Sequence, residues 1–585
     1  MLKTLLAQVK QYKRVSIITP IFSALEAVAD MLLPWLMSKI IDLGVNNPDT
    51  ELGMQMILKY GGWMLVVAAL ALLSGFLAGR FSATAATGFA ANLRDAMYRN
   101  IQRFSFSNID RFSTAGLITR LTTDVSNLQM SYQMLLRICV RAPTMLICAL
   151  VMAFTLHPSL SLVFVVAIAF LVVVLSLIIF KATGLFDKVF QKYDDLNASV
   201  QENVSAIRVV KAFVREDHER GKFSKAADNV YRMFVKAESI VTLNGPVMNF
   251  AVYGCILVLS WLGAKAIVLE GFTEGGLMAL YGYVTSILMS LMMISMIFVM
   301  MSMSLACARR VSAVINEEPD LTSPAQPVTE IPDGSIDFDH VDFSYRKDGT
   351  GKPVLQDVDL HIRSGETIGI LGGTGSAKTS LVNLIPRLYD VTEGAVRVGG
   401  RDVRAYDLKL LRDEVSVVLQ KNVLFSGSIL ENLRWGKKDA SLEDCRRVCK
   451  LACIDDFIMN LPEGYETHVE QGGTNFSGGQ KQRLCIARAL LKQPKILILD
   501  DSTSAVDTAT DARIRRAFRE EIPNTTKLII AQRISSVQDA DRILILHEGQ
   551  VNGFGTHEEL LVGNKIYQEV YESQTGGDFD EKEEA

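Results

Sequence analysis

The stretch that decides the fold of the carboxyl-terminal half is Thr367–Ser380, TIGILGGTGSAKTS. Its first five residues, Thr367–Leu371, form a short apolar run of the kind that builds a buried strand. The next eight, Gly372–Thr379, follow the pattern of a phosphate-binding loop, in which a glycine-rich turn leads from a strand into a helix. In that arrangement backbone N–H groups and the helix N-terminus face an anion. We therefore expect a nucleotide site here, followed by a helix at 380–384.

The residue types within the loop assign roles to it. We expect Lys378 to reach the β- and γ-phosphates and Thr379 to bind a magnesium ion. The glycine that usually precedes the lysine is replaced by Ala377, whose methyl group would crowd the backbone unless the residue takes a helical φ. The loop residues predicted to bind ATP are Gly372, Gly373, Thr374, Gly375, Ser376, Ala377, Lys378, Thr379 and Ser380.

A second apolar strand, Ile496–Leu499, ends in Asp500 and Asp501. A carboxylate at the end of a buried strand can join the ligand shell of magnesium, so Asp500 is a predicted metal ligand.

Between the two strands lies NFSGGQ, Asn475–Gln480, ahead of a predicted helix that ends before Pro494. Ser477 is the expected N-cap, and Gly478 and Gly479 would let the backbone approach an anion. Because this helix end lies so far along the chain from the phosphate loop, we expect it to serve a different nucleotide.

The amino-terminal half has the composition of a membrane domain. Hydrophobic residues make up 49% of the 585-residue chain, and the mean hydropathy is +0.23. Ala142–Phe180 contains no Asp, Glu, Lys or Arg and is interrupted at His157-Pro158, which predicts two spans of about 20 residues each. The six predicted spans are Val15–Leu36, Met54–Gly79, the two halves of Ala142–Phe180, Leu243–Ala264 and Gly275–Ala308.

Basic residues set the predicted orientation in the cytoplasmic membrane. The connection Asn46–Gly53 carries no Lys or Arg, whereas the long connections on the other side are rich in them, so both termini are expected to be cytoplasmic. Met1–Arg14 is interpreted as an uncleaved amphipathic lead-in, since a longer apolar run follows it than a signal peptide has. The long connections predict helices that extend into the cytoplasm and end in short segments near Ser107–Ser113 and Arg215–Lys222.

Composition excludes several classes of protein. With 15 Pro, 41 Gly and 8 Cys, the chain is neither disordered, collagen-like nor a disulfide scaffold. A net charge of −4 argues against a nucleic-acid partner. Cys445, Cys449 and Cys453 recur every fourth residue, which favours a buried helix stripe over a metal site because no histidine lies nearby.

The predicted domains are 1–318 in the membrane, a linker at 319–334, the ATPase domain at 335–573 and an acidic tail at 574–585.

Two features within the spans suggest a substrate path. Glu26 and Asp30 lie four residues apart in the first span, where carboxylates are costly and face a cavity or a partner. Both a cation-binding role and a structural contact to another helix remain open. The last span carries a methionine cluster, which suits either a surface that accepts many ligand shapes or ordinary packing. The proposed path residues are Glu26, Asp30, Met289, Met293 and Met296.

The order of the phosphate loop, Gln420, Phe476–Gln480, Asp500 and Ser504–Asp507 resembles the ATPase domain of an ABC transporter. The six spans with long cytoplasmic extensions resemble the exporter type of that family. The resemblance implies a fold of a six-helix, all-α transmembrane domain followed by an α/β P-loop ATPase domain.

The same resemblance implies roles for single residues. It places Tyr345 on the adenine of ATP, and Gln420 beside the membrane domain and, with Thr379 and Asp500, around Mg²⁺. It also implies that the Ser477–Gln480 signature, which consists of Ser477, Gly478, Gly479 and Gln480, contacts ATP held by a second subunit. The two short cytoplasmic segments match the coupling helices of the family.

Three residues of the nucleotide site depart from the family pattern. Asp501 stands where a Glu normally polarises the attacking water, and its carboxylate is shorter by one methylene, roughly 1.5 Å. Gln532 stands where a His normally faces the γ-phosphate and cannot carry charge. Ala377 is the third departure, whereas the signature is intact apart from Phe476.

This asymmetry predicts one subunit of a heterodimeric ABC exporter, with a weak site of its own and a signature that completes the partner's site. A homodimer with two slow sites is the alternative. The expected cargo is drug-like or amphipathic. A lipid translocase or siderophore transporter of the same architecture and a nucleotide-gated regulatory subunit without productive turnover remain as alternatives. A peptide exporter with an N-terminal protease domain is not expected.

Overall fold

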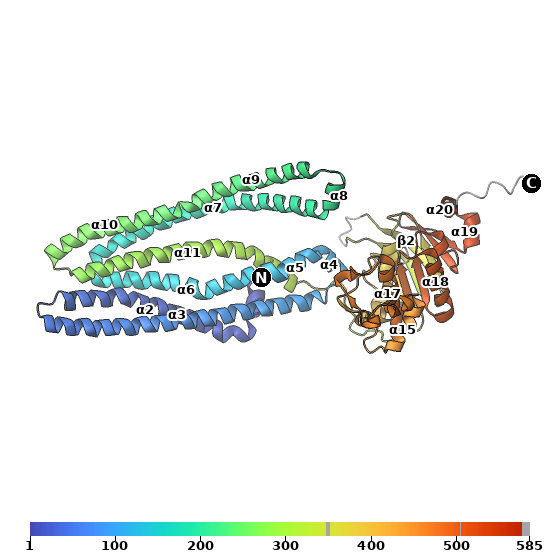
Figure 1. The fold of residues 1–585 in the computed structure, drawn as a ribbon, viewed down its shortest axis with the longest axis horizontal. Helices are drawn as coiled ribbons and strands as arrows, with labels where there is room; N and C mark the ends of the chain where they lie inside the picture. Colours follow the sequence, from blue (N-terminus) through green and yellow to red (C-terminus); the bar gives the residue numbers. More distant parts are fainter. Residues whose placement is uncertain (347–351, 503–504, 576–585) are drawn as a thin grey trace, which may run out of the picture. The chain divides into compact units, whose positions relative to one another are not determined.

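The structure, a computed structural model, describes residues 1–346, 352–502 and 505–575. The chain divides into an all-helical unit, Met1–Arg103 with Ser113–Glu317, and a second unit formed by Phe104–Phe112 and the chain from Glu318 onward. Figure 1 shows long helices in the first unit and mixed helices and strands in the second. The boundary between the two units, at Glu317 and Glu318, lies just before the predicted linker at 319–334.

Six of the described helical stretches are long and apolar enough to cross a membrane, which agrees with the six predicted spans: Lys10–Val45, Thr50–Ile101, Thr114–Leu156, Pro158–Ser205, Glu216–Glu270 and Glu274–Ile297. The elements of this unit are α1 (Leu2–Ala7), η1 (Lys10–Tyr12), α2 (Lys13–Ile40), η2 (Ile41–Val45), α3 (Thr50–Ile101), α5 (Thr114–Thr119), η3 (Arg120–Asp124), α6 (Val125–Leu156), α7 (Pro158–Ser205), α8 (Ile207–Ala212), α9 (Glu216–Thr242), α10 (Asn244–Glu270) and α11 (Glu274–Ile315).

The turns between the long helices follow local sequence rules. Asp49 caps α3 by accepting hydrogen bonds from two backbone N–H groups, and Pro158 stands in the first turn of α7, where its missing N–H is harmless. The α2–α3, α6–α7 and α10–α11 connections lie at one end of this unit, and α8 lies at its other end (Figure 1). The Asn46–Gly53 and His157-Pro158 connections therefore share one end of the unit, as the distribution of basic residues predicts.

One of the two short cytoplasmic segments differs from the prediction. A short helix, α8, spans Ile207–Ala212, whereas Arg215 stands at the N-cap position of the long helix α9 and Glu216–Lys222 form its first turns. The prediction of a short segment at Arg215–Lys222 was therefore wrong by about two helical turns. The chain reverses at the more apolar stretch IRVVKA, and the helical pattern of Glu216–Lys222 belongs to the start of α9.

The described residues of the second unit form two large sheets and a third sheet of only two strands, β7 and β8. A four-stranded antiparallel sheet has the order β2-β1-β4-β5, and a six-stranded, mainly parallel sheet has the order β12-β11-β3-β10-β9-β6. The strands are β1 (Ile336–Phe343), β2 (Leu355–Ile362), β3 (Thr367–Leu371), β4 (Glu393–Val398), β5 (Arg401–Asp402), β6 (Val415–Val418), β7 (Gly427–Ser428), β8 (His468–Val469), β9 (Ile496–Asp500), β10 (Thr526–Ile530), β11 (Arg542–His547) and β12 (Gln550–Gly555).

The helices of this unit are α4 (Phe106–Phe112), α12 (Lys378–Leu384), α13 (Leu408–Glu414), α14 (Ile429–Arg434), α15 (Leu442–Leu451), α16 (Asp455–Met459), α17 (Gly478–Leu491), α18 (Thr508–Glu521), α19 (His557–Gly563) and α20 (Lys565–Thr575). The strand Thr367–Leu371 has the predicted bounds, and α17 ends before Pro494 as predicted.

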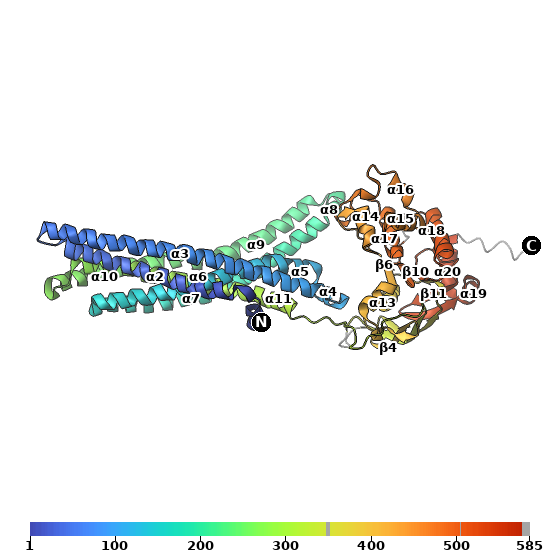
Figure 2. The same ribbon diagram turned by 90° about the horizontal axis from the view of Figure 1, so that it is seen from below.

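Alternate residues of the central strands face two separate cores, because successive side chains of a strand point to opposite faces. Leu497 and Leu499 of β9 pack with α14–α17, whereas Ile496 and Ile498 pack with the antiparallel sheet. Figure 2 shows α14–α17 and β4 on opposite sides of β6, β10 and β11. The central sheet is thus covered on both faces, and its polar residues collect at the strand ends.

The segment Phe104–Phe112 is grouped with the ATPase unit rather than with the helical unit around it in sequence. Tyr389 donates a hydrogen bond to Asp110 at 2.7 Å, and Ser107 donates one to Asp320 at 2.7 Å. Burial, with the hydrogen bond to Asp110, raises the pKa of the Tyr389 hydroxyl. The first predicted segment, Ser107–Ser113, overlaps α4 and has the contacts expected of a segment that touches an ATPase domain.

The predicted cysteine stripe is partly wrong. Cys445 and Cys449 are buried on α15, but this helix ends at Leu451 and Cys453 lies beyond it with a φ of 54°. No group of His, Cys, Asp or Glu in the described part of the chain is arranged to hold a metal ion. Burial raises the pKa of the Cys449 thiol to about 12, so this side chain is a protonated thiol packed in the core.

Candidate nucleotide site

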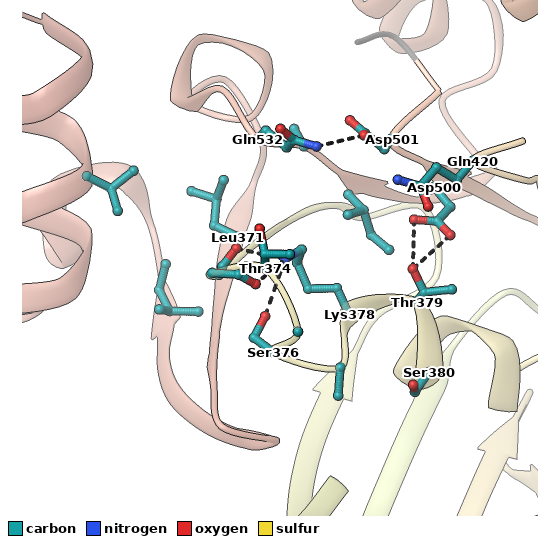
Figure 3. Close-up of a pocket in the computed structure, with 18 of the residues that line it drawn as sticks. Leu371, Thr374, Ser376, Lys378, Thr379, Ser380, Gln420, Asp500, Asp501 and Gln532 are labelled. Atoms are coloured by element: carbon teal, nitrogen blue, oxygen red, sulfur yellow. Dashed lines mark hydrogen bonds between the residues drawn. The ribbon is translucent and has the colours of Figure 1, made fainter. Parts of the chain in front are cut away.

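A pocket of about 520 Å³ lies at the carboxyl ends of the parallel strands β3, β9, β10 and β6. Ligands of open α/β sheets bind at this edge, because the loops that follow adjacent strands meet there. The phosphate loop follows β3, Asp500 ends β9, Gln532 follows β10 and Gln420 follows β6. Figure 3 shows these side chains around one hollow, with Lys378 and Thr379 on one side and Asp501 and Gln532 on another.

Lys378 folds onto its own loop. Its Nζ donates hydrogen bonds to the carbonyls of Gly372 at 2.7 Å and Gly373 at 2.8 Å. Burial lowers the pKa of Lys378, although the charges of Asp500 and Asp501 act against this shift. A phosphate oxygen entering the loop would exchange neutral carbonyl partners for a charged one, which is the stronger hydrogen bond for an ammonium group.

Thr379 and Asp500 already share one place in the pocket. The Thr379 hydroxyl lies 3.0 and 3.2 Å from the two carboxylate oxygens of Asp500. Burial raises the pKa of Asp500, and the nearby charge of Asp501 adds to this shift. These residues fit Mg²⁺, because a hydroxyl and a buried carboxylate are the hard oxygen donors that the ion prefers, and its charge would favour the ionised Asp500. Gln420 lines the same pocket with its amide.

Two of the three departures from the family pattern contact each other. The Gln532 Nε2 group donates a hydrogen bond to an oxygen of the Asp501 carboxylate at 2.8 Å. The two residues follow the neighbouring parallel strands β9 and β10, in which Asp500 pairs with Ile530. The bond occupies one of the oxygens that a general base would offer to water.

Ala377 does not take the helical φ that would relieve crowding by its methyl group. Ala377 has φ 71° and ψ 20°, which is the left-handed conformation, and it is the N-cap of α12. Without a Cβ, glycine takes this conformation freely, whereas it costs other residues roughly 1–2 kcal/mol. The loop therefore keeps the backbone shape that suits glycine although the residue is alanine.

We expect Ala377→Gly to stabilise the ATPase domain against unfolding by up to about 1.5 kcal/mol. The substitution removes left-handed strain of roughly 1–2 kcal/mol, from which about 0.4–1 kcal/mol is lost because glycine gives the unfolded chain more freedom. Chemical denaturation of the full chain in detergent would measure the change. Ser376→Gly, which alters a residue without left-handed φ in the same loop, is the control and should not stabilise the chain. A less stable Ala377→Gly protein would contradict the strain argument.

The Ser477–Gln480 signature forms a complete helix start. The Ser477 hydroxyl accepts from the Gln480 N–H at 3.3 Å, and the Gln480 side chain accepts from the Ser477 N–H at 2.8 Å. This reciprocal capping box holds the first turn of α17, which confirms Ser477 as the N-cap. Within the described residues, none of the four signature residues lines the pocket around the phosphate loop.

The segment predicted at Ser504–Asp507 is only partly visible, since Thr503 and Ser504 lie outside the described residues. Ala505 donates its N–H to Gln482 of α17 at 3.1 Å, and Asp507 caps α18. This segment is thereby tied to the signature helix.

Tyr345, the residue predicted to stack on adenine, lies beside the phosphate-loop helix. Its hydroxyl is 2.9 Å from that of Ser380, and its ring meets the ring of Tyr389 edge-on at 5.1 Å. It is 49% exposed and is not among the described residues that line the pocket. Adenine stacking at Tyr345 stays a prediction.

The sequence did not indicate one wall of the pocket. Three residues of the C-terminal helix α20, Ile566, Tyr567 and Val570, line it together with the phosphate loop. Their spacing marks an apolar helix face, but no local pattern tells which part of the domain that face covers.

Glu26 and Asp30, the carboxylates of the proposed substrate path, are held by an arginine of another helix. Arg141 of α6 lies 2.9 Å from Glu26 and 2.9 Å from Asp30. Arg137 also approaches Glu26, at 3.9 Å. Gly75 of α3 leaves the space for Glu26, since a Cβ there would lie 2.9 Å from its carboxylate. The structure thus has the contact to another helix that was one of the two interpretations.

Met289 and Met296, two turns apart on α11, are 54% and 56% exposed. Met293 lies between them and is half-buried. With i, i+4 and i+7 spacing the three share a helix face. Their part in a substrate path stays a prediction.

We expect Arg141→Ala to destabilise the helical unit strongly, by about 3–5 kcal/mol, because it leaves the buried carboxylate of Glu26 without its close partner. Thermal unfolding of the full chain in detergent would report the loss. The triple variant Arg141→Ala, Glu26→Gln, Asp30→Asn should recover most of the stability, since no buried carboxylate is then left without its close cation. An Arg141→Ala protein as stable as the wild type would show that the ion pairs contribute little.

Both halves of the chain are similar to known proteins. A family model described as the ABC transporter transmembrane region matches residues 16–292, and one described as ABC transporter matches residues 355–504. The uncharacterized ABC transporter ATP-binding protein YfiB of Bacillus subtilis (strain 168) is 35% identical over 571 residues, 98% of each chain. The fatty acid ABC transporter ATP-binding/permease protein of Mycobacterium bovis is 32% identical over 456 residues, 78% of this chain and 71% of that protein.

Among solved structures, that of a bacterial Atm1-family ABC exporter with ATP bound has a TM-score of 0.83 against this chain. The two are 24% identical in sequence, and the match covers 96% of this chain and 99% of the other. This likeness shows the exporter fold across both units.

Proposed function

The chain belongs to the ABC transporter family, and we propose that it is one subunit of a heterodimeric exporter whose own ATP site turns over slowly. It is a membrane protein with six spanning helices and a cytoplasmic ATPase domain that couples ATP hydrolysis to transport. In the proposal this chain binds ATP with Mg²⁺ at its own phosphate loop. Its Ser477–Gln480 signature completes the active site of the partner subunit.

The observation that supports the slow site most directly is the hydrogen bond between Gln532 and Asp501. The carboxylate in the place of the general base is short and already engaged by an amide, and the amide stands where the family has a group that can carry charge. The capping box at Ser477 is complete by contrast. In this proposal, the catalytic groups are weakened at the chain's own ATP site, whereas the signature that it contributes to the partner's site is intact.

The proposed cargo is an amphipathic molecule. Arg141 and Arg137 together balance the charges of Glu26 and Asp30, so this cluster does not present a net negative charge to a cationic drug. That charge balance, together with the relative named as a fatty acid transporter, favours lipid-like amphiphiles as a second candidate cargo.

The test compares ATP hydrolysis by the purified chain alone with hydrolysis by the chain co-purified with a co-encoded half-transporter. We expect the chain alone to hydrolyse ATP at least about tenfold more slowly than the pair, because a misplaced base lowers the rate by one to several powers of ten. In the pair, Lys378→Ala should leave much of the hydrolysis, since most turnover belongs to the partner's site. Rapid hydrolysis by the chain alone would refute the slow site.

Cargo is tested separately in proteoliposomes of the pair. Stimulation of ATPase activity and ATP-dependent movement of the probe would be measured for a cationic dye, a neutral amphiphile and a fatty acid. We expect the amphiphile and the fatty acid to be moved in preference to the dye, and a preference for the dye would contradict the charge-balance argument.

A further inference from the structure

The C-terminal helix α20 lies along the segment that carries Gln532. Ile566, Tyr567 and Val570 line the nucleotide pocket, while Tyr571 and Gln574 line an adjoining hollow. Both hollows include Asp501, Ala531 and Gln532. One helix thus borders the Gln532 segment on two sides, although the sequence marks no functional motif in it.

The side-chain amide of Gln574 forms two hydrogen bonds with the backbone of that segment. Its Nε2 donates a hydrogen bond to the carbonyl of Gln532 at 2.9 Å, and its Oε1 accepts one from the N–H of Ile534 at 2.8 Å. The two bonds bracket Arg533 and hold the chain where it leaves β10. A side-chain amide is suited to this task because it offers a donor and an acceptor side by side.

These two hydrogen bonds fix the backbone position of Gln532 and so the direction of its side chain. That side chain reaches into the pocket and donates to Asp501 at 2.8 Å. A contiguous path of hydrogen bonds therefore runs from α20 through the Gln532 backbone to the carboxylate beside the phosphate loop. Releasing the backbone at residues 532 and 534 would free the Gln532 amide from the edge of the pocket.

We propose that Gln574 is a positioning residue that holds Gln532 toward the terminal phosphate, so that the C-terminal helix sets how well this site distinguishes ATP from ADP. The inference rests on the proposed function in one respect, namely that the phosphate loop of this chain binds ATP. It does not depend on how fast that ATP is hydrolysed. Its readout is the affinity for a nucleotide with a terminal phosphate compared with the affinity for ADP, which lacks it.

The test uses the full chain in detergent with Mg²⁺ and calorimetric titration with ADP and with AMP-PNP, which keeps a terminal phosphate and resists hydrolysis. Gln574→Ala should weaken AMP-PNP binding by about fivefold, the effect of losing roughly 1 kcal/mol of hydrogen bonding, and change ADP binding by less than twofold. Gln574→Glu keeps the side-chain length and the acceptor for Ile534 but loses the donor to Gln532. It should weaken AMP-PNP binding in the same direction.

Gln568→Ala is the matched control. Gln568 lies on the same helix, but its side chain donates to the carbonyl of Leu561 at 2.6 Å and not to the Gln532 segment. Its removal should leave the ratio of the two affinities unchanged. In a Gln532→Ala background the effect of Gln574→Ala should disappear, because the side chain that it positions is gone.

The other outcomes of these titrations count against the proposal. An equal loss of ADP and AMP-PNP binding in Gln574→Ala would show that Gln574 has only a structural role. Unchanged affinities would show that Gln574 does not position Gln532. A wild-type chain that binds no AMP-PNP would overturn both this inference and ATP binding at the site. Fast hydrolysis by the chain alone would refute only the slow-site proposal and leave the affinity ratio to stand.

Discussion

Replacing Asp501 by Glu and Gln532 by His together should raise ATP turnover at this chain's own site by about tenfold to a hundredfold. A positioned general base contributes roughly 10²–10⁴-fold, and part of that contribution is lost when the carboxylate falls short of the water. Glutamate extends the carboxylate by roughly 1.5 Å. The change at residue 532 removes the amide that now donates to Asp501 at 2.8 Å and introduces a group that can carry charge.

The measurement is made in the pair of subunits with Gly479→Ala added in this chain, so that hydrolysis at the partner's site is silenced and only this site is read. Asp501→Glu alone should give a smaller gain, because Gln532 still holds the carboxylate. Asp501→Asn in the same background is the control and should abolish the gain. If the double substitution leaves turnover unchanged, carboxylate reach and the Gln532 contact do not limit the rate.

Gly479→Ala should lower ATP turnover of the pair by about a hundredfold, the scale on which one lost backbone donor to a reacting oxyanion acts. A Cβ at residue 479 would lie 2.7 Å from the carbonyl oxygen of Ala505, a backbone atom that cannot give way cheaply. The first turn of α17 would have to shift, and its N–H groups would lose their aim at the partner's ATP. ATPase assays of the pair would measure the loss.

Gly478→Ala is the matched substitution one residue earlier. Its Cβ would meet the Cβ of Ala505 at 3.4 Å, an ordinary contact, so we expect a loss below tenfold. Photolabelling with an ATP analogue should show ATP still bound at this chain's own phosphate loop in Gly479→Ala. A loss of labelling there, with turnover retained, would mean that the signature serves this chain's own nucleotide.

Local patterns in the sequence were sufficient to predict many of the individual helices and strands. The apolar runs predicted six spans, and the strand Thr367–Leu371 and the N-cap Ser477 lie where their residue types place them. Such features depend on neighbours within one or two helical turns or on alternation along one strand. The short helix at Ile207–Ala212 was not predicted, because a helical pattern does not show where a long helical connection reverses.

The order of the strands is a different kind of information, because it depends on segments that are not neighbours in the sequence. β10 lies between β3 and β9, and this order brings Gln532 onto Asp501 and both beside Lys378. Packing between separate segments also pairs Glu26 with Arg141 and lays α20 across the Gln532 segment. Sequence motifs thus identify the groups that bind nucleotide. Their partners follow from packing between distant segments, where burial and hydrogen bonding select one arrangement that no local pattern encodes.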